Sequence, residues 1–277
     1  MIGIIGQGFV GNAVYQKFKN YYDVLTYDLD ESKSNSNVNE IICNCTNIFV
    51  CLPTPMNKDG SCNISIVEQV LAGIDLTTDN LETERNIIIK STIPPGTTAK
   101  WNRRFESLNI VFNPEFLTEA NAVSDYENQD RIILGGVRPA TTELKTIFSK
   151  VFPKAHIIKT DSTHAEMVKY LTNSFLATKV SFANEMYQIC EGLGVDYDKV
   201  IEYATQDERL GDSHWNVPGP DGDFGYGGHC FPKDVKALMV VAEDMDIIPL
   251  MLAATDVKNN EVRKNRDWEQ MKGRAVT

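Results

Sequence analysis

The sequence predicts an α/β protein: an N-terminal, Rossmann-like doubly wound parallel sheet followed by an all-α domain built on a long helix. An apolar run at residues 2–5 leads directly into a glycine-rich turn and a helical stretch. Apolar strands then alternate with helical patterns, which is typical of parallel sheets with helical crossovers. From residue 165 to 191, apolar residues recur at helical spacing for about seven turns. We therefore expect two domains, at residues 1–161 and 162–277.

The turn after the first strand, Gly6-Gln7-Gly8-Phe9-Val10-Gly11, has the spacing of a dinucleotide-binding fingerprint. There the first glycine makes the turn, the second lets a pyrophosphate approach the following helix, expected at residues 12–20, and the third lets that helix pack on the strand. The second strand, residues 24–27, ends at Asp28. A carboxylate at this point accepts hydrogen bonds from an adenosine ribose and repels a 2′-phosphate, so NAD is favoured over NADP. The alternative is a glycine-rich turn in an unrelated α/β protein.

Polar residues follow the later apolar strands. These strands are expected at residues 48–52, 87–89, 110–112 and 132–134. Thr54, Thr92 and Glu115 come shortly after the first three. Because ligands of open α/β sheets bind outside the carboxyl ends of the strands, the three residues are candidates for one crevice. Each of them, taken singly, is also compatible with a strand-end turn or a helix cap.

The long helix carries Lys169 and Asn173 four residues apart, so their side chains share one face. A Lys–Asn pair on a helix is ordinarily solvated surface, and this alternative stays open on the pattern alone. Further helices are expected at residues 197–205, 234–244 and 250–271.

A glycine-rich segment at residues 225–234 ends in Cys230. Glycines let a backbone approach a ligand closely, and the neighbouring Lys233, together with His229 when protonated, would favour a thiolate over a thiol. This arrangement is typical of a presented nucleophile. The alternative is a glycine-rich turn with a structural cysteine ahead of a helix.

Composition narrows the functional classes. The chain has 277 residues, 42% of them hydrophobic, and a formal net charge of -11, which argues against tight binding to nucleic acid. No apolar run approaches the roughly 20 residues of a membrane span, so we expect a cytoplasmic protein. Six cysteines are too few for a disulfide scaffold in a chain of this length, and their spacing lacks the paired form of zinc ligands, so no metal site is expected.

Six segments, taken together and in order, resemble the UDP-glucose/GDP-mannose dehydrogenase family. They cover residues 6–11, 53–55, 90–96, 113–120, 169–177 and 225–234, which extend over nearly the whole chain. The resemblance implies an NAD-dependent, two-step oxidation of the C6 hydroxyl of a nucleotide sugar to a carboxylate. The residues after Cys230, Phe231-Pro232-Lys233, are more similar to the UDP-glucose branch, so oxidation of UDP-glucose to UDP-glucuronate is the expected reaction.

The resemblance also implies catalytic roles. Cys230 would hold the aldehyde as a thiohemiacetal, which a second hydride loss converts into a thioester. Glu115 would act as general base in thioester hydrolysis, with Thr92 positioning water. Lys169 and Asn173 would stabilise the oxyanion that develops at C6.

The remaining site residues follow from the same resemblance. Asp234 would order the catalytic network or assist proton transfer. The expected cofactor contacts are Gly6, Gly8, Phe9, Val10, Gly11, Asp28, Lys33, Thr54, Thr92, Glu119 and Lys233. The expected substrate contacts are Glu115, Phe116, Leu117, Glu119, Lys169, Asn173, Arg209, Phe224 and Gly227.

Two further features bear on assembly. Arg209 resembles an arginine that reaches into the neighbouring subunit's sugar site, although the loop from Arg209 to Cys230 is longer than usual and a surface arginine is the alternative. The family implies a homodimer paired through the long-helix domain. Family members typically continue into a further nucleotide-binding domain, whereas this sequence stops at Thr277 as in a short form, so how the nucleotide is held is left open.

Two other functions fit parts of the pattern. A β-hydroxyacid or 6-phosphogluconate type dehydrogenase shares the layout and uses a lysine on the long helix, but it needs no cysteine. A non-catalytic subunit that binds NAD or a nucleotide sugar would keep the fold without turnover.

Overall fold

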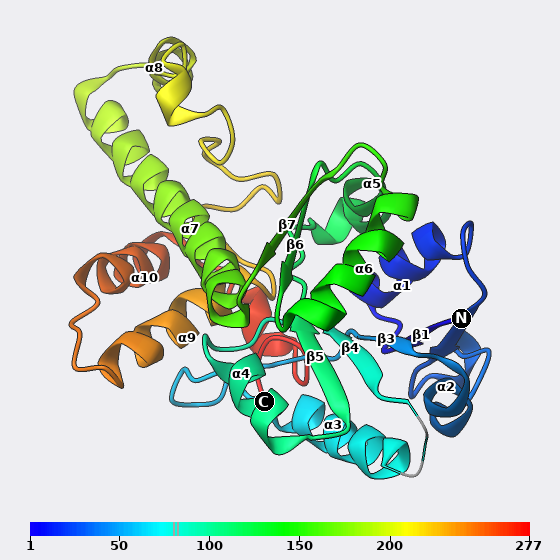
Figure 1. Ribbon diagram of the computed structural model, residues 1–277. Coiled ribbons are helices and arrows are strands. Elements are labelled where there is room, and N and C mark those ends of the chain that lie inside the picture. The colour runs from blue at the N-terminus through cyan, green and yellow to red at the C-terminus, as the bar shows by residue number, and fades with distance from the viewer. Residues whose placement is uncertain (80, 82) are drawn as a thin grey trace. The chain divides into compact units, whose positions relative to one another are not determined.

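A computed structural model describes residues 1–79, 81 and 83–277 of the chain (Figure 1). Within them, seven strands form one sheet in the order β2-β1-β3-β4-β5-β6-β7. The strands are β1 (Ile2–Ile5), β2 (Val24–Tyr27), β3 (Asn47–Val50), β4 (Arg85–Ile89), β5 (Leu108–Phe112), β6 (Arg131–Gly135) and β7 (His156–Thr160). The α-helices are α1 (Phe9–Phe18), α2 (Val38–Asn44), α3 (Ser65–Thr78), α4 (Thr97–Arg104), α5 (Ala122–Glu127), α6 (Arg138–Val151), α7 (Ser162–Leu193), α8 (Tyr197–Ala204), α9 (Phe231–Glu243) and α10 (Leu250–Val262).

The doubly wound α/β prediction is confirmed, but the expectation of a wholly parallel sheet is wrong. Neighbouring strands from β2 to β5 are parallel, whereas β5 and β6 are antiparallel, with Phe112 opposite Gly135. The residues between them therefore lead into β6 from the edge at which β5 ends, without recrossing the sheet. β7, which we did not expect, then pairs parallel to β6.

Several element ends differ from the sequence-based expectations. α1 begins at Phe9, three residues earlier than expected, because Gly8 already serves as its N-cap. α10 ends at Val262 because Arg263 is extended, and a short 3-10 helix, η4 (Asp267–Gln270), follows. β3 ends at Val50, so Cys51 and Leu52 lie outside the strand.

The chain forms two compact units. Unit 1 comprises Met1–Thr54 and Ile64–Lys169, and unit 2 comprises Pro55–Asn63 and Tyr170–Thr277. In unit 1, one face of the sheet packs on residues of α2, α3 and α4, and the other face packs on residues of α1, α5 and α6. The buried strands read as continuous apolar runs because both faces are covered.

Unit 2 has its own apolar clusters and one unexpected segment. One cluster joins α7 to Tyr197 of α8 and to Trp215, and a second joins Ala177 of α7 to Tyr226 and to Val235 of α9. The segment Pro55–Asn63 pairs with the end of the chain, since Met56 donates its N–H to the Ala275 carbonyl at 2.8 Å. A short piece from early in the sequence is thus part of the helical unit.

Candidate active site

The glycine turn of unit 1 fits a dinucleotide. Gly6 has φ +93°, and a Cβ there would stand closer than 3.0 Å to the Cys51 carbonyl. A Cβ on Gly11 would collide with the Gly6 carbonyl, so both positions require glycine in the protein itself. Around Gly8, by contrast, no described atom beyond Gly8 and its two chain neighbours lies within 4 Å of the Cβ position. Gly8 therefore leaves open space at the N-terminus of α1, where a pyrophosphate would be held.

Asp28 is held in place for a ribose. One carboxylate oxygen accepts the Gln7 N–H at 2.6 Å and the other accepts the Asp30 N–H at 2.9 Å. The carboxylate is therefore fixed next to the glycine turn, in the arrangement that adenosine ribose binding requires. Together with the open space at Gly8, this shows that the residues present fit NAD.

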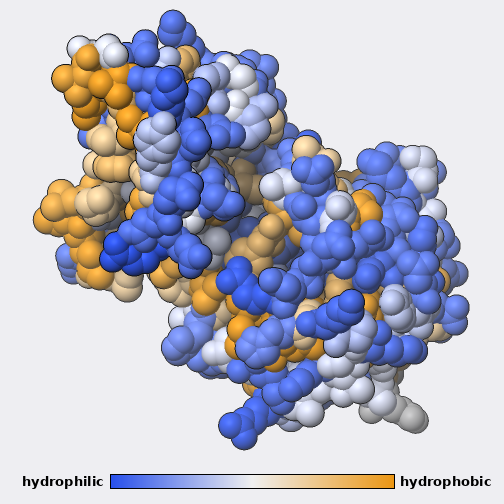
Figure 2. Space-filling view, turned by 90° about the horizontal axis from the view of Figure 1, so that it is seen from above, coloured by the Kyte–Doolittle hydropathy of each residue, from blue (hydrophilic) through white to orange (hydrophobic). Residues whose placement is uncertain are grey.

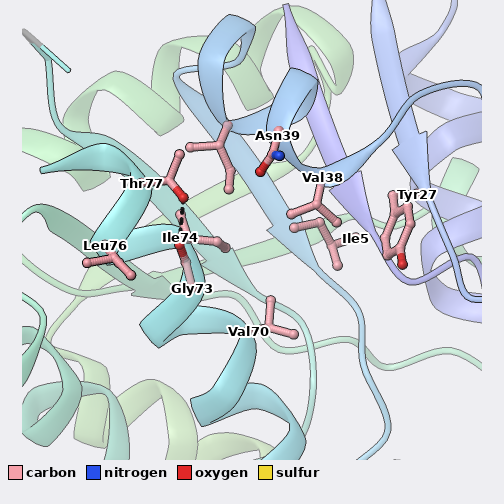
Figure 3. Close-up of a pocket in the computed structure, with 10 residues that line it drawn as sticks. Ile5, Tyr27, Val38, Asn39, Val70, Gly73, Ile74, Leu76 and Thr77 are labelled. Atoms are coloured by element: carbon pink, nitrogen blue, oxygen red, sulfur yellow. Dashed lines mark hydrogen bonds between the residues drawn. The ribbon is translucent and has the colours of Figure 1, made fainter. Parts of the chain in front are cut away.

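A cavity of about 380 Å³ lies between α2 and α3, beside the ends of β1 and β2 (Figure 3). Ile5, Val38 and Val70 line it, together with the ring of Tyr27, the residue before Asp28. The described residues that line it include no aspartate, glutamate, histidine, cysteine, lysine or arginine. The cavity thus offers apolar surface and no acid–base chemistry.

The edge formed by the ends of β3 and β4 brings Thr54 and Thr92 together. The hydroxyl of Thr54 donates to the Thr92 carbonyl at 2.8 Å, and both residues are buried. One residue earlier, the Ser91 hydroxyl donates to the Leu52 carbonyl at 2.6 Å. Because β3, β4 and β5 are parallel neighbours, Glu115 follows the same edge of the sheet.

Glu115 and Lys169 form a buried ion pair within unit 1. The Lys169 Nζ donates to Glu115 Oε1 at 2.8 Å and to the Glu115 carbonyl at 2.6 Å, and Oε2 accepts the Leu117 N–H at 2.7 Å. Their side chains are only 6% and 3% exposed. Burial raises the pKa of the Glu115 carboxyl, but the charge and hydrogen bond of Lys169 outweigh it, so its pKa lies below the ordinary value. Glu115 is therefore held ionised and able to accept a proton.

A second buried lysine, Lys90, holds the turn that carries Glu115. Its Nζ donates to Asn113 Oδ1 at 2.9 Å and to the Pro114 carbonyl at 3.4 Å. Burial lowers the pKa of Lys90 to about 8. Sequence reasoning assigned Lys90 no role, although a lysine at the end of an apolar strand was a signal.

Glu166 of α7 is a further residue that sequence reasoning missed. Its buried carboxylate accepts the N–H groups of Gly96 at 2.6 Å and of Thr98 at 2.8 Å, at the start of α4. The loop that carries Thr92 is thereby fastened to the helix turn that carries Lys169. Burial raises the pKa of Glu166 despite these hydrogen bonds. The signal in the sequence was its position three residues before Lys169.

In unit 2, Cys230 is the N-cap residue of α9 and is partly exposed. A helix N-terminus favours a thiolate. One turn along, Asp234 is buried and accepts the Asn173 amide at 2.6 Å and the Lys233 ammonium. Burial lowers the pKa of Lys233, but the charge and hydrogen bond of Asp234, together with the negative charges of Cys230 and Cys62 as thiolates, outweigh it, so the net shift is upward. A permanent cation therefore lies near the thiol of Cys230.

Three further residues of unit 2 were expected to contact substrate, namely Arg209, Phe224 and Gly227, and the structure shows the protein groups that surround each of them. The Arg209 side chain is 88% exposed and pairs with Asp207 of its own loop. The ring of Phe224 packs edge-on against Tyr187, with 5.6 Å between ring centroids. Gly227 packs against residues of η4 and the end of α10.

The remaining expected contacts belong to unit 1. Phe9 and Val10 form the first turn of α1. Lys33 is half-exposed and pairs with Asp30 at 3.0 Å, and Glu119 is exposed. The guanidinium of Arg131 lies over the ring of Phe116, 4.4 Å from its centroid.

The catalytic candidates thus form two sets, each arranged within its own unit. Thr92, Glu115 and Lys169 belong to unit 1, and Cys230, Asn173 and Asp234 belong to unit 2. Lys169 and Asn173 are both on α7, four residues apart, so the shared face is confirmed and both side chains are buried. The solvated-surface alternative for this pair is wrong.

Two kinds of feature are absent from residues 1–79, 81 and 83–277. In these ranges no cluster of three histidine, cysteine or acidic side chains could hold a metal ion. None of the helices described there has the length and apolar character needed to cross a membrane.

The chain is similar to known proteins over most of its length. Residues 33–155 match the NAD binding domain of the UDP-glucose/GDP-mannose dehydrogenase family, and residues 163–261 match its central domain. The chain belongs to this family. It carries the NAD-binding and central domains of an NAD-dependent oxidoreductase, which confirms the cofactor expected from Gly6–Gly11 and Asp28.

Individual proteins named as UDP-glucose dehydrogenases are similar to the chain. The chain is 30% identical to the UDP-glucose 6-dehydrogenase AglM of Haloferax volcanii over 96% of its length and 71% of the relative's. It is 33% identical to the UDP-glucose 6-dehydrogenase of Rickettsia bellii, over 90% of this chain and 57% of that protein. The structure of a UDP-glucose dehydrogenase from Pyrobaculum islandicum matches with a TM-score of 0.84 and 26% identity, covering 94% of this chain and 68% of the other. The chain thus spans part of the length of each.

Proposed function

We propose that the protein oxidises the C6 hydroxyl of a nucleotide sugar, UDP-glucose, to a carboxylate with two molecules of NAD, through a covalent intermediate on Cys230. The observation that carries the proposal is the position of Cys230 at the N-terminus of α9, beside the buried Lys233–Asp234 pair. Family membership and the names of the relatives support the substrate class. Relatives named for UDP-glucose support the choice of hexose and base.

Bound NAD supplies a hydride acceptor, once for each of the two oxidations. The first removal of hydride and proton from the C6 alcohol gives an aldehyde. The Cys230 thiolate adds to its carbonyl carbon, and protonation of the oxygen gives a thiohemiacetal. The helix N-terminus and the Lys233 cation stabilise the thiolate that this addition requires. Loss of a second hydride and proton leaves a thioester.

The catalytic candidates of unit 1 act in the hydrolysis of the thioester. The lowered pKa of Glu115 keeps its carboxylate ionised, so it can take a proton from the attacking water. Water adds to the thioester carbon, and the C–S bond then breaks to return Cys230 as a thiol and release the acid. Lys169 and Asn173 donate to the oxyanion at C6.

Product stoichiometry tests the reaction. We expect two NADH per UDP-glucose consumed, and UDP-glucuronate as product by mass spectrometry. One NADH per substrate would instead indicate a β-hydroxyacid type dehydrogenase. Parallel assays with GDP-mannose, UDP-N-acetylglucosamine and UDP-N-acetylmannosamine define the base and the hexose, and a preference for one of them would contradict UDP-glucose.

The Cys230→Ala variant tests the covalent step, with Cys190→Ala as a control because Cys190 is buried in the apolar cluster of α7 and α8. We expect Cys230→Ala to abolish acid formation and Cys190→Ala to keep it. Turnover of Cys230→Ala to the acid at the wild-type rate would refute the covalent mechanism. If NAD raises the melting temperature of the wild type but NADH never forms, the chain is a binding subunit.

The proposed assembly is a homodimer paired through α7. Four apolar side chains on this helix, Leu171, Phe175, Phe182 and Ile189, are 60%, 63%, 49% and 49% exposed. Their spacing of four, seven and seven residues places them on one stripe. Figure 2 shows further exposed apolar residues, in orange, on the side on which Figure 1 draws α8 and α10. A stripe of this kind is costly to leave in water, which favours pairing with a second copy.

Light scattering after gel filtration tests the dimer. Phe175→Asp places a charge in the stripe and should shift the mass to that of a monomer. The control Leu29→Asp changes a residue that is 92% exposed in unit 1 and should leave the mass unchanged. A dimer in both variants would contradict pairing through α7.

A further inference from the structure

The backbone of the glycine segment, residues 225–228, is bound by side chains from elsewhere in unit 2. The amide of Asn259 on α10 bonds Tyr226 twice, accepting its N–H at 2.7 Å and donating to its carbonyl at 3.0 Å. Asn184 of α7 accepts the Gly225 N–H at 3.1 Å, and Asp267 of η4 accepts the Gly228 N–H at 3.0 Å. Three separated side chains thus replace the bonds that a sheet neighbour would otherwise supply.

Two of the glycines are required by these same side chains. A Cβ on Gly225 would lie closer than 3.0 Å to Asn259 Oδ1, and Gly225 also has φ +69°. A Cβ on Gly227 would lie equally close to the guanidinium of Arg263 and to Asp267. We expected these glycines to let the backbone approach a ligand closely. In the structure, the space of their missing side chains is filled by the protein's own polar groups.

Arg263 ties the segment to the long loop before it. Its side chain is 1% exposed and lies 2.7 Å from Asp221, 3.6 Å from Asp223 and 3.3 Å from Asp267. Asp221 and Asp223 belong to a turn that is closed by the Gly219 N–H donating to the Asp223 carbonyl at 2.8 Å. A buried guanidinium needs such partners because its desolvation is otherwise costly. The loop therefore supplies two carboxylates to Arg263.

We propose that Asn259 and Arg263 are positioning residues that fix the glycine segment and thereby orient the thiol of Cys230 for attack. The inference rests on the proposed function, in which Cys230 is the nucleophile. Only His229 separates residues 225–228 from Cys230. The position of this fixed backbone therefore determines the position of the Cys230 side chain. A displacement of about 1 Å at a reacting atom can reduce a rate a hundredfold.

The first test compares Asn259→Ala with Asn260→Ala, the same change one residue along α10, where the Asn260 amide donates to Asp256 at 3.1 Å. The measurements are the rate at which iodoacetamide alkylates Cys230, followed by mass spectrometry of its peptide, and kcat and KM for UDP-glucose. For Asn259→Ala we expect an alkylation rate changed at least threefold and kcat lowered tenfold or more, with KM changed less. Asn260→Ala should match the wild type.

The second test is a double-mutant cycle of Gly227→Ala and Arg263→Lys. It does not depend on the folding of Asn259→Ala. A lysine keeps the charge but removes the guanidinium nitrogen that occupies the Cβ space of Gly227. If the segment is fixed as proposed, Gly227→Ala lowers kcat and shifts the alkylation rate less in the Arg263→Lys background than in the wild type. If Gly227 is instead needed for contact with a hexose, Gly227→Ala raises KM equally in both backgrounds, and the inference is overturned.

The alkylation rate separates failure of this inference from failure of the proposed function. The alkylation rate measures the accessibility and reactivity of the Cys230 thiol, and it does not require the enzyme to turn over. If Cys230→Ala stays active while Asn259→Ala changes the alkylation rate, the covalent mechanism is wrong and the positioning holds. If folded Asn259→Ala keeps wild-type alkylation and kcat, the positioning is wrong whatever the reaction.

Discussion

The buried pair of Glu115 and Lys169 makes the stability of unit 1 depend on pH in a direction that one substitution should reverse. In the wild type, the pKa of Glu115 lies below its ordinary value of 4.5. The ionised carboxylate therefore stabilises the fold above about pH 4.5, and this contribution is lost as the pH falls through the folded-state pKa. Lys169→Met removes the cation but keeps most of the side-chain volume.

The expected magnitude follows from burial. Both side chains are nearly inaccessible to water, and breaking a buried ion pair by removing one partner costs about 3–5 kcal/mol. Without Lys169, burial dominates and raises the pKa of Glu115 above 4.5. The variant should then lose stability as the pH rises from 4.5 toward neutrality, because folding requires an uncompensated buried charge. At pH 7.5 we expect a loss of roughly 10 °C in melting temperature.

Thermal melts between pH 4 and pH 8, followed by circular dichroism, measure this effect. The control is Lys154→Met, the same change at an exposed lysine. The double variant Lys169→Met/Glu115→Gln should regain part of the loss at pH 7.5, since a neutral amide is less costly to bury. An equal loss for Lys169→Met at pH 4 and pH 8 would refute the reasoning, because the effect would then come from packing alone.

Three more outcomes are expected. Burial lowers the pKa of Lys90 from 10.5 to about 8. The free energy of unfolding of the wild type should therefore rise by on the order of 3 kcal/mol between pH 8 and pH 10.5. Thermal melts of Lys90→Met over the same pH range should lack this rise. Gly8→Ala should keep the melting temperature without ligand but lose its increase with NAD, whereas Gly11→Ala, which collides with the Gly6 carbonyl, should melt lower even without ligand. Glu166→Gln leaves one N–H at the start of α4 facing an NH₂ group and should cost about 1–3 kcal/mol in denaturant melts; an unchanged midpoint would contradict this.

Much of the candidate site could be predicted because its residues follow recognisable local patterns. Gly6–Gly11 and Asp28 stand at fixed offsets from apolar strands, and the helical period places Lys169 and Asn173 on one face of α7. The residues that hold these groups in place could not be predicted in the same way. Glu166 bonds groups 68 and 70 residues away, and no local pattern specifies partners at such separations.

The sequence by itself determined β1 to β6, the dinucleotide turn with the helix after it, and the long helix, because hydrophobic period and glycine spacing act over a few residues. Only the tertiary structure decided that β6 runs antiparallel to β5, that residues 55–63 join the helical unit, and that Asn259 and Arg263 occupy the space beside the glycine segment. These features depend on contacts between residues far apart in the chain. For the segment before Cys230 the difference matters most, because its glycines are matched to side chains that follow more than 30 residues later.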